Sequence, residues 1–214
     1  MTIITFSMIS HLHVMKNDTK VFLLKVLIHL GALIPLANLY FSAFNDELGV
    51  DPVKAVIHFT GIGALNLLLL TLSVTPLAQL AKQGYVLKVR RLLGLYAFTY
   101  ALFHLLNFLA FEVQFDGALF ISEIFKRPYI TIGVIAFFLL GALAITSLNK
   151  VKRKMGKSWQ RLHNVSYVII LLVTIHFYWS VKSELTSPLF YFALALILLL
   201  VRYKKIKRIL LPNL

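Results

Sequence analysis

Six long apolar segments dominate the sequence and constrain its fold more than any other feature. A helix needs about 20 apolar residues to cross the hydrocarbon core of a bilayer, and the six runs approach or reach that length. They are unbroken and rich in Leu, Ile, Ala and Phe, whereas strands of a membrane barrel alternate in polarity over about ten residues. The sequence therefore predicts an all-α integral membrane protein, a six-transmembrane-helix bundle with spans at residues 21–41, 56–77, 92–111, 129–148, 162–181 and 188–203.

Basic residues gather in the segments that six spans place on one side of the membrane. The chain has 22 Lys and Arg against 8 Asp and Glu, for a formal net charge of +14. Such a balance can indicate nucleic-acid binding, but here the position of the charge decides otherwise. The side with most of the acids holds only four basic residues, Lys54, Lys126, Arg127 and Lys182. By the positive-inside rule we expect both termini in the cytoplasm, and we expect no nucleic-acid partner.

The most basic loop, at residues 150–157, has a second interpretation. Its sequence KVKRKMGK suits anionic lipid or an acidic partner. Membrane topology alone accounts for the same charges and is the favoured interpretation.

The spans follow one another without a long soluble insert, which predicts a single membrane domain. We place this domain at residues 21–207, between cytoplasmic tails at residues 1–20 and 208–214. The sequence has no Cys, which excludes disulfides, thiolate nucleophiles and cysteine-ligated iron–sulfur clusters. The loop at residues 112–128 mixes phenylalanines with acids and predicts a short amphipathic segment at the interface.

Two histidines lie inside apolar runs, where a titratable side chain is costly and usually faces the bundle interior. His104 follows Arg91 by 13 residues, which is roughly 20 Å at a rise of about 1.5 Å per residue. His176 precedes the end of its span at Val181 by five residues. Both are therefore expected in the outer half of the membrane. Two imidazoles on two helices suit the axial positions of one haem iron and hence electron transfer; the alternative is two histidines that only link helices by hydrogen bonds.

Three further positions are candidates with weaker support. His163 lies at the cytoplasmic mouth of the fifth span, and the step to His176 turns an ideal helix by about 220° beyond three turns. We expect His163 to contact an inner haem or a flavin, or else to be interfacial. Arg90 and Arg91 lie where an inner haem would need a histidine, and their guanidinium groups suit a propionate or phosphate. His58 could hydrogen-bond a propionate or quinone, ligate iron, or have a structural role.

Four blocks of sequence resemble the MsrQ (YedZ) family within the ferric-reductase-like transmembrane superfamily. The similarity extends over residues 21–207 and keeps the order of the six helices. The blocks are HFTGIGALNLLLLTLSVTPL, RRLLGLYAFTYALFHLLNFLAFE, KRPYITIGVIAFFLLGALAITS and SWQRLHNVSYVIILLVTIHFYW.

The resemblance implies an electron-transfer subunit of a bacterial inner-membrane oxidoreductase complex, rather than its catalytic subunit. It implies one or two b-type haems and a flavin mononucleotide (FMN). Electrons would pass from the ubiquinone or menaquinone pool to a periplasmic molybdenum-cofactor reductase, MsrP, which repairs methionine sulfoxide in envelope proteins. The family's haem ligands correspond to His104, His163 and His176. The wider superfamily has a histidine pair on both the third and the fifth helix, whereas this chain has Arg90 or Arg91 at the inner position of the third.

The electron donor is expected outside this chain, because the sequence has no G-x-G-x-x-G fingerprint for a nicotinamide or flavin domain. A quinol that enters from the bilayer is one route, and a separate cytosolic flavin reductase acting through bound flavin is the other. Two rival functions remain open. One is a ferric or metal-complex reductase, and the other, outside redox chemistry, is a transporter or scaffold whose histidines only connect helices.

Overall fold

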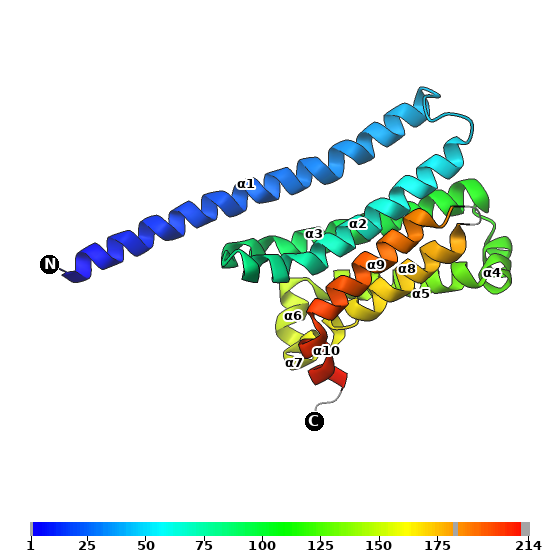
Figure 1. Ribbon diagram of the computed structural model, residues 1–214. Coiled ribbons are helices and arrows are strands. Elements are labelled where there is room, and N and C mark those ends of the chain that lie inside the picture. The colour runs from blue at the N-terminus through cyan, green and yellow to red at the C-terminus, as the bar shows by residue number, and fades with distance from the viewer. Residues whose placement is uncertain (1, 182–183, 211–214) are drawn as a thin grey trace.

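The computed structural model describes residues 2–181 and 184–210, and these residues form helices joined by short turns (Figure 1). The long helices follow the predicted order of spans. They are α1 (Thr2–Phe44), α2 (Pro52–Leu80), α3 (Arg90–Asn107), α5 (Pro128–Thr146), α8 (Ser166–Ser180) and α9 (Thr186–Val201).

Five segments are long and apolar enough to cross a membrane, so the prediction of a multi-pass, all-α membrane protein is confirmed. They are Asn17–Phe44, Pro52–Leu80, Gly84–Glu112, Pro128–Thr146 and Lys157–Ser180. The sixth predicted span corresponds to α9, which has 16 residues. At about 1.5 Å per residue, α9 covers roughly 24 Å of a hydrocarbon core about 30 Å thick. A sixth complete span therefore stays a prediction.

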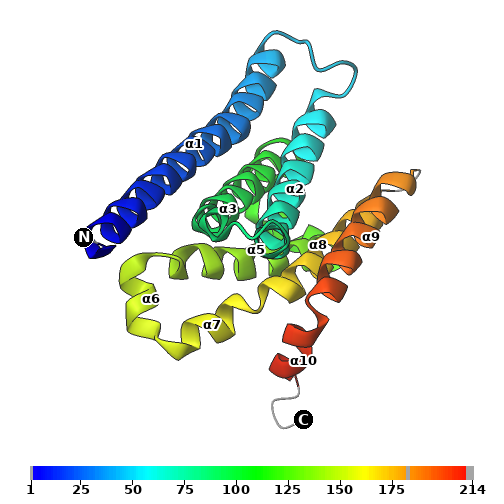
Figure 2. The same ribbon diagram turned by 60° about the vertical axis from the view of Figure 1, so that its left-hand side comes forward.

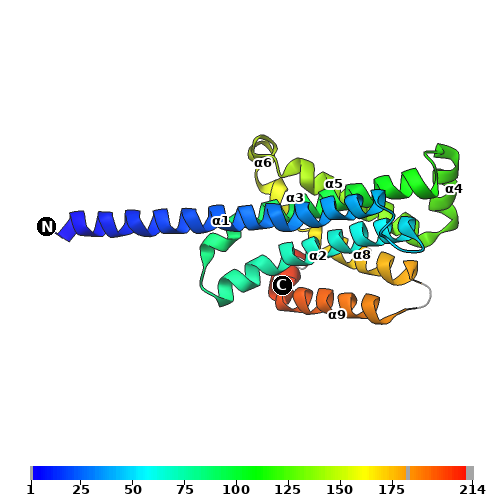
Figure 3. The ribbon, with the colours of Figure 1, turned by 90° about the horizontal axis from the view of Figure 1, so that it is seen from above.

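Helix α1 begins earlier than the sequence pattern suggested. Helix α1 starts at Thr2 and runs for 43 residues, so the segment predicted to be a cytoplasmic tail, residues 1–20, is helical from Thr2. Its place outside the membrane stays a prediction. The first 20 residues contain neither Gly nor Pro, so no helix-breaking residue separates them from the apolar span. The N-terminal part of α1 consequently projects well beyond the other helices (Figures 1 and 3).

The connections between the helices lie at two opposite ends of the bundle (Figure 1). The turns that join α1 to α2 and α3 to α5 contain Asp46, Asp51 and Asp116, and we call this the acidic end. The other end carries Arg90 at the start of α3 and the basic helix α6 (Asn149–Met155), and we call it the basic end. The charge asymmetry of the sequence is thus an asymmetry between the two ends of the structure.

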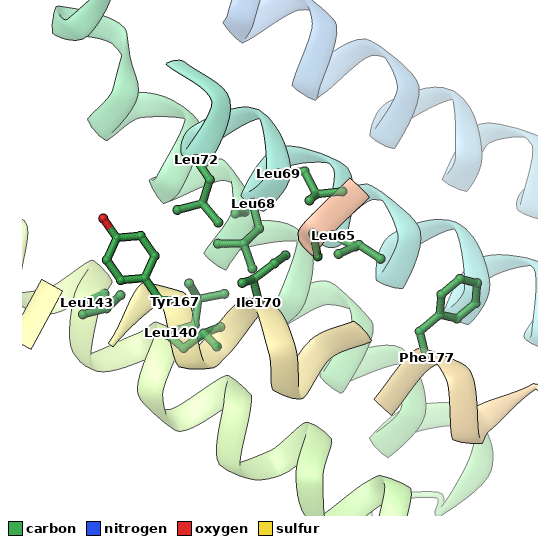
Figure 4. Close-up of a cluster of buried hydrophobic side chains, with 12 residues drawn as sticks. Leu65, Leu68, Leu69, Leu72, Leu140, Leu143, Tyr167, Ile170 and Phe177 are labelled. Atoms are coloured by element: carbon green, nitrogen blue, oxygen red, sulfur yellow. The ribbon is translucent and has the colours of Figure 1, made fainter. Parts of the chain in front are cut away.

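Two antiparallel helix pairs, α2 with α3 and α5 with α8, form the centre of the bundle, and α9 packs on α8 and α2 (Figure 2). Their contact is an apolar core in which leucines of α2 meet side chains of α5 and α8 (Figure 4). Leu65 and Leu72 of α2 and Ile169 and Ile170 of α8 are almost completely buried. This core fixes the relative positions of α3 and α8.

The fifth span, Lys157–Ser180, is long and apolar enough to cross a membrane, but it contains a local break near its basic end. Helix α7 (Lys157–His163) ends before α8 begins at Ser166. Backbone bonds of the tighter i to i+3 kind occur at the break, from Val165 N–H to Leu162 O at 3.0 Å and from Tyr167 N–H to Asn164 O at 3.1 Å. A local change from α-helical to 3₁₀ bonding alters the direction in which successive side chains point.

Short helices complete the fold. The amphipathic segment expected at residues 112–128 contains α4 (Gly117–Lys126), whose first turn is capped by Asp116 through bonds from Ala118 N–H at 2.8 Å and Leu119 N–H at 3.0 Å. The remaining short elements are η1 (Gly84–Val89), a π-helical turn η2 (Phe108–Glu112) and α10 (Tyr203–Leu210).

A buried arginine joins the end of α9 to α2 and α8. Pro76 has no N–H, so the carbonyl of Leu72, four residues earlier in α2, lacks its helical donor. The guanidinium of Arg202 donates Nη2–H to this carbonyl at 2.5 Å and Nη1–H to the hydroxyl of Tyr167 at 3.1 Å. Arg202 is buried, and its position is therefore explained by the acceptor that the proline leaves free.

We expect Arg202→Met to destabilise the protein by about 1–2 kcal/mol, because a buried carbonyl and a hydroxyl lose their partner. Thermal unfolding in detergent measures the effect, with exposed Lys204→Met as the matched control. Pro76→Ala added to Arg202→Met restores an N–H for Leu72 and should recover part of the loss. A Tm for Arg202→Met equal to that of Lys204→Met would contradict the assignment.

Candidate functional site

The structure brings His104 of α3 and His176 of α8 side by side near the acidic end. Their ring centres are 6.1 Å apart and their ring planes cross at 86°. Each histidine lies in the last turns of its helix, and both side chains are half-buried. The pair lies where the helix pairs α2–α3 and α5–α8 meet.

Each imidazole is oriented by a backbone carbonyl of the helix next to its own. His104 Nδ1 lies 2.9 Å from the carbonyl oxygen of Ile57 in α2, and His176 Nδ1 lies 2.7 Å from that of Tyr129 in α5. A carbonyl oxygen can only accept, so Nδ1 carries the hydrogen in both rings. The neutral ring then keeps its lone pair on Nε2, which is the atom that a metal would take.

A glycine makes each of these contacts possible. A Cβ atom at Gly61 would lie 2.9 Å from Nδ1 of His104, and one at Gly133 would lie 2.8 Å from Nδ1 of His176. Each glycine follows the accepting carbonyl by four residues, at the position whose side chain would otherwise cover that carbonyl. The missing side chains therefore let the imidazoles reach the helix backbone.

The two histidine environments repeat each other. The hydrogen bond spans 47 residues in both cases, from Ile57 to His104 and from Tyr129 to His176. The pairs α2–α3 and α5–α8 thus present one histidine each by the same device, and they meet at the His104–His176 contact.

Two histidine nitrogens suit a haem iron, because the porphyrin supplies the other ligands of the metal. The two imidazoles, whose ring centres are 6.1 Å apart, would each offer one nitrogen to an iron held between them. In the part of the chain that the structure describes, no third His, Asp or Glu joins the pair to form a metal-binding group. Haem would need only two ligands from the protein, and two neutral histidines would suit that role.

His58 lies at the edge of this site. It follows Ile57, the acceptor for His104, and its ring centre is 6.1 Å from that of Phe177, which follows His176. The side chain of His58 is exposed, so it neighbours the pair without belonging to it.

His163 is at the basic end, away from the pair. The hydroxyl of Thr146 donates to the carbonyl of Ala142 at 2.7 Å, so it accepts from Nε2–H of His163 at 3.1 Å. The imidazole also stacks on Trp159, with ring centres 4.0 Å apart. In this arrangement Nε2 of His163 forms a hydrogen bond. Among the described residues, Nε2 of His104 and Nε2 of His176 have no such partner.

Arg90 and Arg91 also lie at the basic end. Arg91 is exposed and donates to Oδ1 of Asn149 at 2.7 Å. Arg90 is half-buried and interacts electrostatically with both His163 and Arg202. The six candidate residues therefore separate into His104, His176 and the neighbouring His58 at the acidic end, and His163 with the two arginines at the other.

Sequence reasoning missed the residues that orient the pair. The sequence alone did not connect Gly61 and Gly133 with the histidines, and the carbonyls of Ile57 and Tyr129 carry no side-chain signal. A detectable signal does exist, because Gly61 precedes His104 by the same separation as Gly133 precedes His176. Thr146 and Trp159, which hold His163, were also missed.

No solved structure matches this chain. The sequence model described as "Ferric reductase like transmembrane component" matches residues 59–174, which is more than half of the 214 residues. The match contains Gly61, His104, Gly133 and His163 and ends two residues before His176. It indicates a membrane electron-transfer component of a kind that typically binds haem. The chain therefore belongs to the ferric reductase-like transmembrane component family.

Proposed function

We propose that this protein is the haem b membrane subunit of a periplasmic methionine sulfoxide repair system of the MsrQ type. In this proposal His104 and His176 hold one haem, and electrons from the quinone pool leave toward a periplasmic molybdenum-cofactor reductase, MsrP. The observation that carries it is the adjacent pair of imidazoles, each with Nδ1 bound to a backbone carbonyl and with no hydrogen-bond partner for Nε2 among the residues that the structure describes.

The haem would supply one-electron redox chemistry. The protein residues around the haem would decide whether it transfers electrons or reacts with a substrate. If His104 and His176 both hold the iron, they would leave no open position for a substrate, which favours electron transfer over catalysis at the metal. The carbonyls of Ile57 and Tyr129 fix the ring orientation and make Nε2 a better donor.

The position of the pair supports an outlet at the acidic end. If the basic end faces the cytoplasm, as the positive-inside rule predicts, the acidic end and the histidine pair lie toward the periplasm. Helix α4 has an exposed Ile121, and the turn before it has an exposed Phe115. The two would offer the partner an amphipathic surface. The proposal accordingly has an MsrP-type reductase receive electrons there.

The basic end suits an inner cofactor. Arg90, Arg91, Trp159 and His163 combine guanidinium groups with stacked aromatic rings, which suits the phosphate and the flat ring of FMN. We include FMN at this end in the proposal, with His163 as its contact. Because Nε2 of His163 bonds to Thr146, an inner haem would first require that ring to turn.

A second candidate function, ferric or metal-complex reduction, is favoured by the description of the matched family. It needs the same haem and the same direction of transfer, and differs only in the acceptor at the acidic end. A non-redox transporter or scaffold predicts a protein that binds no haem.

Substitution of either axial residue tests the haem site. His104→Gly and His176→Gly should each abolish the low-spin b-type bands in the reduced-minus-oxidised visible spectrum, and added imidazole should restore part of them. The measurement is haem per polypeptide on purified protein by the pyridine haemochrome assay. Unchanged bands in both variants would rule out the pair. His163→Ala is expected to keep this haem and to lose bound flavin.

The two glycines provide a test of ring orientation without removal of a ligand. In Gly61→Ala or Gly133→Ala the new Cβ displaces the imidazole from its carbonyl, which should lower haem affinity about 10–100-fold. Haem titration of the purified apoprotein measures it. Gly94→Ala is the matched control, because its Cβ would meet Thr71 at an ordinary 3.6 Å. Equal affinities in all three variants would contradict the role of the carbonyls.

The identity of the electron acceptor distinguishes the two proposed redox functions. After reduction with dithionite and removal of excess reductant, the haem should be reoxidised rapidly by an MsrP-type reductase with methionine sulfoxide, and slowly by ferric citrate. Stopped-flow absorbance measures both rates. Faster reoxidation by ferric citrate would favour the metal reductase.

A further inference from the structure

A second polar pair lies in the membrane-spanning region, outside the histidine site. His29 of α1 faces Tyr96 of α3, with Nδ1 and the phenol oxygen 2.5 Å apart and the ring centres 5.5 Å apart. His29 lies within the apolar span Asn17–Phe44, and its side chain is exposed. In a bilayer that exposure is to lipid, where an ionisable side chain is expensive and marks a function by default.

The pair can still bind a ligand. In the described part of the chain, Nε2 of His29 has no hydrogen-bond partner. The imidazole and the phenol together offer one acceptor and one donor, and both can exchange a proton. A molecule that uses them must arrive through the bilayer and carry hydrogen-bonding oxygens on an apolar body.

The position of α1 against α3 is fixed on either side of this pair. Toward the basic end, Lys88 forms an ion pair with Asp18 at 2.8 Å. Toward the acidic end, the hydroxyl of Tyr100 donates to Ala32 O at 2.6 Å and that of Tyr40 to Asn107 Oδ1 at 3.0 Å. The His29–Tyr96 contact is therefore held in place by its neighbours rather than by its own hydrogen bond alone.

The same face of α3 connects the pair to the haem-binding histidine. Tyr96, Tyr100 and His104 follow one another at intervals of four residues, so they form one row along the helix. Tyr96 and His104 are eight residues apart, or roughly 12 Å along the axis at about 1.5 Å per residue. Tyr100 lies between them and is buried.

We propose that His29 and Tyr96 bind the head group of a membrane quinol between α1 and α3. A lipid-soluble 1,4-quinone has a ring oxygen that this hydrogen-bonded pair can bind and an apolar tail that stays in the bilayer. The assignment rests on the proposed function, in which a quinol is the electron donor, and adds the site where it binds. His29 accepts a hydrogen bond from a quinol hydroxyl, and Tyr96 orients His29 and the head group.

The test uses the full-length haem protein in lipid nanodiscs with decylubiquinol as the probe. His29→Leu should slow haem reduction by subsaturating decylubiquinol about tenfold, which corresponds to roughly 1.4 kcal/mol, and Tyr96→Phe should slow it by a smaller factor. Reduction by dithionite should be unchanged in both. Tyr40→Phe is the matched control, because it removes another hydrogen bond between α1 and α3, and it should behave as the wild type.

Photolabelling with an azido-ubiquinone gives a readout that does not depend on haem. Label should map to the peptides of α1 and α3 around His29 and Tyr96, and His29→Leu should reduce it. Wild-type rates in His29→Leu, or label elsewhere, would overturn the site. Dithionite-reducible haem that decylubiquinol does not reduce, with no label on α1 or α3, would overturn the quinol site and leave the haem proposal intact. Absence of haem together with specific label would overturn the proposed function and support the site.

Discussion

Within a bilayer, polar atoms cannot rely on water for hydrogen bonds, and this constraint accounts for the main polar contacts of the structure. The two imidazoles are satisfied by carbonyls that Gly61 and Gly133 leave uncovered. The carbonyl that Pro76 leaves without a donor is satisfied by Arg202. In each case a glycine or proline leaves a backbone carbonyl accessible, and a side chain from another helix donates a hydrogen bond to it.

The repeated arrangement of α2–α3 and α5–α8 gives the bundle one symmetric end and one asymmetric end. At the acidic end the two halves contribute equivalent histidines. At the basic end α7 contributes His163, whereas α3 begins with Arg90 and Arg91. Such an arrangement suits a haem between the halves at one end and a different, anionic group at the other. The proposed outlet for electrons lies at the acidic end, whereas the proposed quinol site at His29 and Tyr96 lies between α1 and α3.

Much of this architecture could be predicted from the sequence, because apolar length and the expense of titratable groups in lipid are local properties. They predicted the long helices, and they singled out His104 and His176, which the structure places next to each other. The break between α7 and α8 and the helical N-terminus of α1 were not found, since hydrophobicity alone does not report where backbone bonding changes. The Gly61 and Gly133 contacts, and the His29–Tyr96 pair, depend on helix neighbours that one sequence does not specify. The equal sequence separations from Gly61 to His104 and from Gly133 to His176 would have indicated the two glycines.

Low-temperature electron paramagnetic resonance of the oxidised, purified protein tests the central claim most directly, because the signal reports which atoms ligate the iron and how they are oriented. Two histidine ligands predict a low-spin ferric signal. Ring planes that cross at 86° predict the strongly anisotropic form of that signal, with a large maximum g value, since perpendicular imidazoles leave the iron d orbitals nearly degenerate. A high-spin signal, which requires an open or weakly ligated axial position, would contradict the assignment of His104 and His176 as the axial pair.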